Sequence, residues 1–398
     1  MPEQPVMRIA ILAHYATWAL EGQPGYRPDP QRHPTSWVMN LVRGLAELGG
    51  HEVHVVTQTD EIDRDMAVKK DGVTLHFVRC PRRLRAATLF QFDRRRLKRA
   101  LDAIAPDIVH AFGTEDCYGL AGLTSGHPCV MTMQCLQFKI AETLPPPRFS
   151  RGRITLAVER WCIRRARHLI GMSAYGTEGL RPVAPHAQIY EVPNAVAPVF
   201  FQTIGEPETD RLFFVGVIEK RKGLEYLVDA VTRVRERRPA VKLAIGGVPG
   251  RGAEACFSAV KQQVEVNGLT DAVEFLGFLR PENVAREMAR ASVIVVPSLE
   301  EMFCNVAAEA MAVGRPVVAS RVAALPQLVD EGVTGLLTPP ADPNALAQAI
   351  EPLLADDARR ARFGTAARDK ARHHWHPAEV AKQTVAIYQT VLADKARL

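Results

Sequence analysis

Residues 297–337, PSLEEMFCNVAAEAMAVGRPVVASRVAALPQLVDEGVTGLL, decide the fold. A short apolar strand, Val293–Val296, comes directly before them, and the alanine-rich run at 307–312 predicts a closely packed helix. Glu301 then lies on the loop after the strand and Glu309 in the first turns of the helix. Ligands of open α/β sheets bind at the carboxyl ends of the strands, and a carboxylate can accept two hydrogen bonds from a vicinal diol. The stretch therefore predicts a parallel α/β sheet with a site for a sugar or a ribose.

The same stretch resembles the nucleotide-binding signature of the retaining glycosyltransferases of family 4, which have the GT-B fold. The similarity continues through GRPVVAS at 314–320 and GVTGLL at 332–337. Taken alone, two glutamates eight residues apart are usually surface residues. The resemblance instead implies that Glu301 contacts the transferred sugar and that Glu309 contacts the ribose of the nucleotide. Asn305, which lies between the two glutamates in the sequence, is expected to be the N-cap of the helix.

A second segment, FFVGVIEKRKGL at 213–224, predicts a phosphate site. A strand ends at Gly216, three cations follow, and an amphipathic helix begins after Gly223. Cations, helix N-termini and backbone amides can stabilise a leaving diphosphate without a metal. The resemblance places Lys222 at the family's phosphate-binding lysine.

One departure from the family pattern lies in this segment. The family usually has arginine directly after the glycine, where this chain has Val217. A lost charge-assisted contact is worth about 1.5–3 kcal/mol. Lys220 or Arg221 is the expected source of the missing cation, and we count Arg221 with Lys222 and Glu301 as the expected catalytic residues.

The other residues expected in the donor site stand at strand ends or at the start of the alanine-rich helix. Glycine at a strand end lets the backbone approach a ligand, although it also simply makes turns. The expected nucleotide- and sugar-binding residues are Gly216, Lys220, Gly246, Gly277, Phe278, Phe303, Cys304, Asn305, Val306 and Glu309.

By resemblance, the first part of the chain binds the acceptor, with His110, Glu115, Gln134 and Ser36 as candidates. Gln134 stands where many relatives have histidine. Glutamine can hydrogen-bond sugar hydroxyls but cannot act as a base near pH 7. This favours same-face substitution, the mechanism often proposed for the family, in which the leaving phosphate takes the acceptor's proton. His110, at the end of a strand, fits a buried structural histidine equally well.

Apolar runs alternate with helical patterns along the whole chain, which predicts α/β architecture with two doubly wound Rossmann-like domains. The GT-B resemblance implies that the two face each other across a cleft. The expected domains are 1–195, joined by a C-terminal helix at 376–398, and 208–375, with a linker near 193–207. A helix is expected at 36–48. Strands are expected at 8–12, 52–56, 73–78, 108–110, 128–133, 168–172 and 188–192, then at 211–215, 242–245, 273–275, 292–296, 316–319 and 335–337.

The composition is that of an ordinary globular protein: 398 residues, 47% hydrophobic and 24% charged. No apolar run approaches the roughly 18–20 residues that span a bilayer, and no leader is evident, so we expect a cytoplasmic protein. Seven cysteines without a C-x-x-C pair indicate free thiols rather than a zinc site. No cofactor and no metal are expected: the histidines at 373, 374 and 376 read as a turn, and DRD at 63–65 as a solvated loop without a flanking strand.

The net charge of +6 is unevenly distributed, because residues 1–200 carry 25 Lys and Arg against 19 Asp and Glu. Arginines alternate with apolar residues at 79–99 and 148–167. These stretches are either solvated helix faces or a basic amphipathic surface that holds the protein on an anionic membrane. No recognition motif accompanies the charge, so a nucleic-acid partner is not expected.

The resemblance thus implies a retaining, metal-independent glycosyltransferase that moves a sugar from a UDP- or GDP-sugar to a hydroxyl of a glycan or lipid-linked acceptor. Surface polysaccharide or glycolipid synthesis is the expected setting. Two alternatives stay open. One is a phosphorylase or epimerase of the same fold. The other is a non-catalytic sugar-nucleotide-binding paralogue, to which the departures at Val217, at Gln134 and in the loop after the first strand lend some weight.

Overall fold

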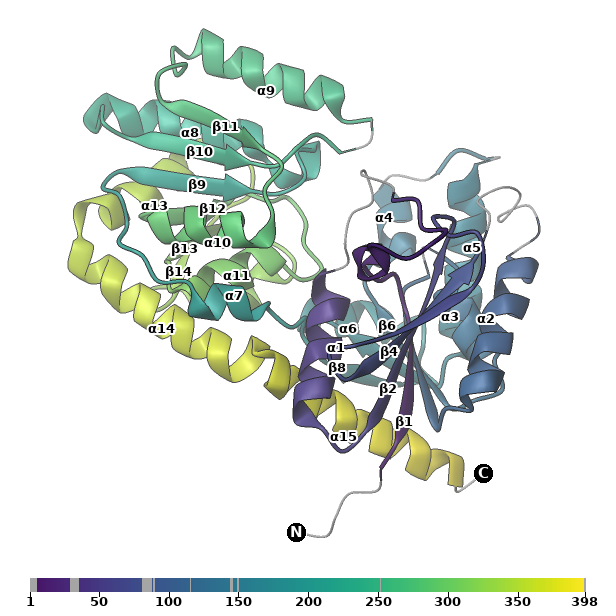
Figure 1. Cartoon of the computed structure of the whole chain (residues 1–398). Coiled ribbons are helices and arrows are strands. Elements are labelled where there is room, and N and C mark those ends of the chain that lie inside the picture. Colours follow the sequence, from purple (N-terminus) through teal and green to yellow (C-terminus); the bar gives the residue numbers. More distant parts are fainter. Residues whose placement is uncertain are drawn as a thin grey trace. The chain divides into compact units, whose positions relative to one another are not determined.

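The computed structural model describes residues 6–28, 36–80, 88, 90–114, 116–143, 146–148, 150–250 and 252–396. The chain divides into two compact units, each built on one sheet (Figure 1). The first unit comprises Met1–Ala195 and Pro377–Leu398, and the second comprises Val196–His376. The second unit also takes up residues 196–207, where the sequence suggested a linker. There Pro198 begins the short helix α7 (Pro198–Gln202).

The sheet of the first unit has the strand order β3-β4-β2-β1-β5-β6-β7-β8. All pairings are parallel except that of β3 with β4. The order reverses at β1, which has β2 on one side and β5 on the other. The strands are β1 (Arg8–Leu12), β2 (Glu52–Thr59), β3 (Met66–Lys70), β4 (Val73–Arg79), β5 (Ile108–Phe112), β6 (Cys129–Met133), β7 (His168–Gly171) and β8 (Gln188–Glu191).

Strand β3 was not predicted, and its presence corrects the reading of the DRD stretch. Residues 63–65 lie between β2 and β3, so the stretch does have flanking strands, although all three residues are exposed. The Asp65 carboxylate accepts a hydrogen bond from the backbone N of Arg79, at 2.7 Å. Edge strands often carry charged residues, and β3 carries Lys69 and Lys70. Its sequence therefore lacks the apolar pattern by which the inner strands were predicted.

Helices α1 (Ser36–Leu48) and α15 (Pro377–Ala396) pack together on one face of this sheet (Figure 1). They approach so closely that a Cβ added at Gly44 would lie 2.2 Å from the carbonyl oxygen of Pro377. Tyr388 of α15 is fully buried in the shared core. The other elements of the unit are η1 (Thr17–Leu20), α2 (Gln91–Ile104), α3 (Tyr118–Leu123), α4 (Gln137–Thr143), α5 (Arg151–Arg165) and α6 (Ala174–Leu180).

The sheet of the second unit is wholly parallel, in the order β11-β10-β9-β12-β13-β14. Numbered within the unit this is 3-2-1-4-5-6, the order of dinucleotide-binding Rossmann sheets. It reverses at β9, which separates β10 from β12. The strands are β9 (Arg211–Val215), β10 (Lys242–Gly246), β11 (Val273–Gly277), β12 (Val293–Val296), β13 (Val317–Ser320) and β14 (Gly335–Thr338).

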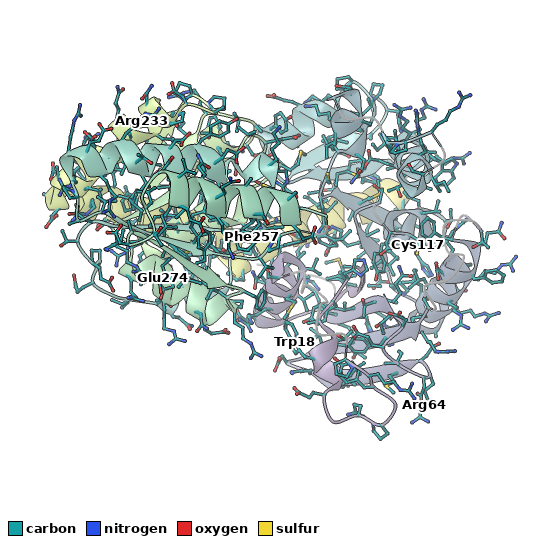
Figure 2. The ribbon with its side chains drawn as sticks, turned by 90° about the horizontal axis from the view of Figure 1, so that it is seen from above. Trp18, Arg64, Cys117, Arg233, Phe257 and Glu274 are labelled. Atoms are coloured by element: carbon teal, nitrogen blue, oxygen red, sulfur yellow. The ribbon has the colours of Figure 1, made fainter. Side chains whose placement is uncertain are left out.

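Helices cover both faces of this second sheet. Phe257 of α9 (Glu254–Val266; Figure 2) packs edge to face on Phe275 of β11, with ring centroids 5.6 Å apart. Where α11 (Asn305–Val313) packs on α14 (Asp357–Trp375), a Cβ added at Gly364 would lie 2.2 Å from the Gly314 carbonyl oxygen. The remaining elements are η2 (Lys220–Lys222), α8 (Leu224–Arg237), α9 (Glu254–Val266), α10 (Pro281–Arg290), α11 (Asn305–Val313), α12 (Leu325–Leu328), α13 (Pro343–Ala355) and α14 (Asp357–Trp375).

The histidine cluster near residue 375 is not a turn, as the sequence had suggested. His373 and His374 lie in the last turn of α14, and His376 is its C-cap. Helix-forming alanines and arginines upstream carry the helix through them. Within the described ranges, no three His, Cys, Asp or Glu side chains come together as a metal site. Over the same ranges, no helix combines the length and apolarity required to span a bilayer.

Candidate functional site

The loops after β9 and β12 meet beside the point where the strand order of the second sheet reverses. The backbone N of Leu299 donates to the carbonyl oxygen of Arg221 at 2.7 Å. Gly223 has φ +63°, and a Cβ there would lie 2.1 Å from the carbonyl oxygen of Pro297. Only glycine permits both the left-handed backbone and this close approach. The sequence thereby brings the three cations of one loop next to the carboxylate of the other.

Lys222 and Glu301 form the centre of this site. The Lys222 Nζ donates to Glu301 Oε1 at 2.6 Å, and the Ser298 hydroxyl donates to the same oxygen at 2.8 Å. The Glu301 side chain is 6% exposed and that of Lys222 14%. The Glu301 carbonyl also accepts from the backbone N of Ala324, at 3.1 Å. Glu301 is therefore a buried, fully oriented carboxylate with one cation in direct contact.

Arg221 lies near the other oxygen of the same carboxylate. Its Nη1 lies 3.8 Å from Glu301 Oε2, and its Nε lies 2.6 Å from Glu219 Oε1. Lys220, the other expected source of a cation, is exposed. Of the two candidates, Arg221 is the one whose contact with Glu301 places it in the site.

Glu309 lies on α11 and is partly exposed to solvent. Burial raises the pKa of Glu309 to about 8, so the carboxyl is mostly protonated at neutral pH in the unliganded protein. Burial likewise raises the pKa of Cys304 to about 12, which keeps this thiol protonated and excludes it as a nucleophile.

Four expected donor-site residues lie around the start of α11, and one prediction about them is wrong. Asn305 is not the N-cap, because the helix begins with it and Cys304 takes the capping position with extended backbone. Cys304 is 2% exposed and Phe303 7%, with the Phe303 ring edge to face on Trp375. The side chains of Phe303 and Cys304 are thus buried in the core next to the start of α11. Val306 remains partly exposed.

Backbone hydrogen bonds join the glycines at the carboxyl ends of the neighbouring strands β9, β10 and β11. Gly216 N donates to the Gly246 carbonyl at 3.1 Å, and Gly247 N donates to the Gly277 carbonyl at 2.7 Å. A Cβ at Gly247, where φ is +127°, would lie 1.9 Å from the Gly216 carbonyl oxygen. Phe278 follows with 57% of its surface exposed. These loops form a backbone-lined edge that ends in an exposed aromatic ring.

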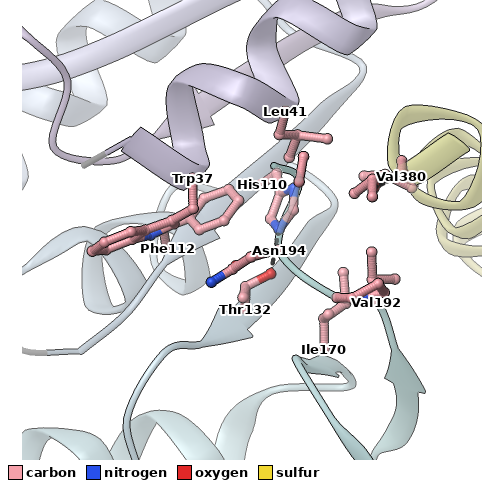
Figure 3. Close-up of a pocket in the computed structure, with 12 residues that line it drawn as sticks. Trp37, Leu41, His110, Phe112, Thr132, Ile170, Val192, Asn194 and Val380 are labelled. Atoms are coloured by element: carbon pink, nitrogen blue, oxygen red, sulfur yellow. Dashed lines mark hydrogen bonds between the residues drawn. The ribbon is translucent and has the colours of Figure 1, made fainter. Parts of the chain in front are cut away.

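In the first unit, His110 belongs to the core (Figure 3). It is 1% exposed, its Nδ1 lies 2.8 Å from the Tyr388 hydroxyl and its Nε2 lies 2.7 Å from the Thr132 hydroxyl. Burial lowers the pKa of His110 to about 3. The ring borders a cavity of about 20 Å³, which has room for one water. Of the two roles left open by the sequence, the geometry supports the structural one, because both ring nitrogens are engaged.

The other two described acceptor-side candidates lie in different segments of the first unit. Gln134 follows β6 and is partly exposed, and its Nε2 is buried with no hydrogen-bond partner within the described part of the chain. Ser36 is the first residue of α1. Glu115 lies outside the described residues. The fully buried carboxylate of Glu159 accepts from the backbone N of Phe138 at 2.8 Å and so holds the first turn of α4, which follows Gln134 in the chain.

One polar pair was missed by reasoning from the sequence. His14 Nε2 lies 2.7 Å from Asp116 Oδ2, with side-chain exposures of 41% and 14%. The Tyr118 hydroxyl is 3.4 Å from His14 Nδ1. His14 follows β1 and Asp116 follows β5, the two strands that are neighbours where the first sheet reverses its order. Their positions just after expected strands were the available signal, but strand adjacency was needed to pair them.

Two family models match the chain and together cover most of it. The model described as "Glycosyl transferases group 1" matches residues 209–356, and the one described as "Glycosyl transferase 4-like domain" matches residues 34–195. The chain belongs to the group 1 glycosyl transferases.

Curated relatives of this chain match it over part of their length. A D-inositol 3-phosphate glycosyltransferase of Corynebacterium urealyticum is 36% identical over 184 residues, which are 45% of this chain and 42% of the relative. A second protein of that name, from Corynebacterium glutamicum, is 36% identical over 185 residues, 46% of this chain and 44% of the relative. The matched stretch thus spans less than half the length of these relatives.

Solved structures agree with the GT-B fold over almost the whole chain. Sucrose-phosphate synthase from Thermosynechococcus elongatus has a TM-score of 0.77 at 24% identity, covering 98% of this chain and 100% of that one. The Anabaena protein HepE in complex with UDP and glucose has a TM-score of 0.71 at 17% identity, with 96% and 99% covered. At these identities the likeness shows the fold.

Most residues expected on the donor side lie at the carboxyl ends of the strands of the second sheet. They comprise the ion-paired Lys222, Arg221 and Glu301, the Glu309 carboxyl and the hydrogen-bonded glycines. The His14–Asp116 pair, which was not among the expected acceptor residues, is a well-defined polar feature of the first unit.

Proposed function

We propose that the protein is a retaining, metal-independent glycosyltransferase that uses a UDP- or GDP-sugar. The single observation that carries the proposal is the contact of Lys222 and Arg221 with buried Glu301 where the second sheet reverses its strand order. Ligands of such sheets bind at this place, and paired cations suit a diphosphate. Family membership gives the reaction class, and retention and metal independence belong to the proposal.

The proposed reaction breaks the bond between the anomeric carbon and the diphosphate oxygen. A new bond forms on the same face from the anomeric carbon to the acceptor oxygen, and the acceptor's proton goes to the leaving phosphate. Lys222 and Arg221 stabilise the negative charge that develops on the diphosphate. Glu301 contacts the transferred sugar, and Glu309 accepts hydrogen bonds from the ribose hydroxyls.

UDP is the first nucleotide to test, because HepE was solved with UDP and glucose. On the acceptor side we propose a hydroxyl of a glycan or of a lipid-linked glycan, in surface polysaccharide or glycolipid synthesis. Gln134 and the His14–Asp116 pair are the polar groups of the first unit that support acceptor binding at the strand ends. The relatives named for D-inositol 3-phosphate make that compound one acceptor to include.

The proposal is tested with a panel of UDP- and GDP-sugars in the presence of EDTA. We expect one of them to bind by calorimetry and to be consumed, slowly with water and faster with the correct acceptor, and the product to keep the anomeric configuration of the donor. Turnover lost in EDTA and restored by a divalent metal would contradict metal independence. Binding without turnover would favour a non-catalytic paralogue, and release of a sugar 1-phosphate on adding phosphate would identify a phosphorylase.

We also propose that the basic face of α2 holds the protein on an anionic membrane. Exposed Arg95 and Arg99 share this helix with Phe92, which is 65% exposed. A basic surface with an apolar side chain suits an anionic bilayer, where each basic residue is worth about 1 kcal/mol.

Sedimentation with vesicles at physiological salt tests the membrane proposal. We expect the protein to bind phosphatidylserine-containing vesicles, and we expect Arg95→Glu/Arg99→Glu to reduce that binding about tenfold or more. Arg237→Glu, on an exposed arginine of α8 in the second unit, is the matched control and should bind as the wild type does. Equal binding to neutral and anionic vesicles would reject the proposal.

A further inference from the structure

We infer that Glu219 is the positioning residue that holds Arg221 in the diphosphate site, and that this pair supplies the cation absent at Val217. The inference rests on the proposed function of the site. It concerns a residue that the expected donor set did not include, and it explains how the site retains two cations despite the departure at Val217.

The first observation is the geometry of the Arg221 side chain. Its Nε contacts Glu219 Oε1 at 2.6 Å, while its Nη1 lies 3.8 Å from Glu301 Oε2. A guanidinium has five N–H donors in a fixed fork. With Nε engaged by Glu219, donors remain at the far end of the fork for a ligand. The Arg221 side chain is 49% exposed, so packing restricts it little and the ion pair with Glu219 is the main restraint on its rotamers. Because the side chain is already ordered by this ion pair, less rotamer entropy is lost when a ligand binds.

The second observation is that the backbone around the pair is fixed. Lys222 N donates to the Glu219 carbonyl at 2.9 Å, and Gly223 N donates to the Lys220 carbonyl at 3.1 Å. The Arg221 carbonyl accepts from Leu299 N, on the loop that carries Glu301. The turn therefore presents Arg221 and Lys222 to the two oxygens of one carboxylate, and a ligand diphosphate meets two positioned cations.

The third observation concerns position 217 itself. Val217 is 37% exposed and lies against the loop after β10, since a Cβ added at Gly250 would be 2.9 Å from Val217 Cγ1. An apolar side chain thus fills the place of the family's arginine. The Gly250 Cβ position is also 3.7 Å from Glu219 Oε2, so the Glu219 carboxylate borders the same loop. An arginine at position 217 and Arg221 held by Glu219 are therefore alternative sources of the positive charge at this edge of the site.

Calorimetry with UDP and GDP, using the full chain, tests the inference. For the nucleotide that binds, we expect Arg221→Ala to weaken affinity about tenfold or more and Glu219→Gln about three- to tenfold. The double variant Glu219→Gln/Arg221→Ala should bind no more weakly than Arg221→Ala alone, because Glu219 acts through Arg221. Glu351→Gln is the matched control, since Glu351 pairs with Arg237 at 2.9 Å on the same unit, and it should leave affinity unchanged.

Rescue separates a positioning role from a merely structural one. Val217→Arg in the Arg221→Ala background should recover most of the lost affinity, and recovery should not depend on Glu219. The melting temperature without nucleotide should be the same for Glu219→Gln and the wild type.

Two failures have distinct meanings. If the wild type binds neither UDP nor GDP, the proposed function fails. If it binds one of them while Glu219→Gln has no effect, or while the effects of Glu219→Gln and Arg221→Ala simply add, the inference about Glu219 is wrong and the proposed function stands.

Discussion

Lys222→Ala is expected to lower kcat/KM about 10²- to 10³-fold with whichever sugar nucleotide proves active. The lysine ammonium lies 2.6 Å from buried Glu301, at the place where the departing diphosphate would gain charge. Removing one oriented donor from such a site typically has an effect of this size. The measurement is the initial rate of nucleotide release at subsaturating donor.

The same substitution has a second consequence, for stability. Glu301 is 6% exposed, and a buried carboxylate without its cation is destabilising, by about 3 kcal/mol or more. We expect Lys222→Ala/Glu301→Gln to recover most of the free energy of unfolding, measured with urea, because the double variant leaves no buried charge. Turnover should stay low.

Lys370→Ala is the matched control for Lys222→Ala. Lys370 lies on α14 of the same unit, is similarly buried, at 18% exposure, and pairs with Asp330 at 2.8 Å. It should keep wild-type kcat/KM. Activity of Lys222→Ala within twofold of wild type would remove the lysine from the proposed mechanism.

Much of the fold was predictable because the inner strands of parallel sheets are buried on both faces and appear as short apolar runs. The predicted strand 211–215 coincides with β9, and 335–337 falls one residue short of the end of β14. The edge strand β3 escaped because its exposed lysines break the apolar pattern. The order of the strands along the chain does not give their order in the sheet. Only the order in the sheet shows that β9 and β12 are neighbours.

The candidate site was predictable to the extent that its residues sit directly after strands. Lys222 and Glu301 were each named from their own segments, and the structure shows the ion pair between them. The Glu219–Arg221 pair and the His14–Asp116 pair were not foreseen, because both depend on side-chain direction within loops. His110 had two interpretations from the sequence. Its contacts with Thr132 and with Tyr388, which is 278 residues away, decide between them.

Glu309 should make the unfolding free energy fall as the pH rises. Burial raises the pKa of Glu309 from 4.5 to about 8 in the folded protein. Between those values the folded state keeps a proton that the unfolded chain has lost, so stability decreases with rising pH and levels off above about 8. The full shift would correspond to about 5 kcal/mol. Because the side chain is partly exposed, we expect about 2–3 kcal/mol. Glu309→Gln should remove this loss, as measured by urea unfolding at pH 5 and pH 9.

The protonated state of Glu309 should also affect donor binding, in the opposite direction. An ionised carboxylate accepts hydrogen bonds from both ribose hydroxyls, whereas the protonated form must use one oxygen as a donor. If the ionised form binds, affinity should rise about tenfold between pH 7 and pH 9, following the ionised fraction of a group with a pKa of about 8. A UDP-sugar is the suitable probe, because its diphosphate is fully ionised over this range. Glu309→Gln should bind more weakly and without this pH dependence, while the Glu351→Gln control should follow the wild type. A wild-type affinity that is flat from pH 7 to pH 9 would mean that Glu309 does not bind the ribose as a carboxylate. In that case its burial would have to be explained by packing of α11 alone.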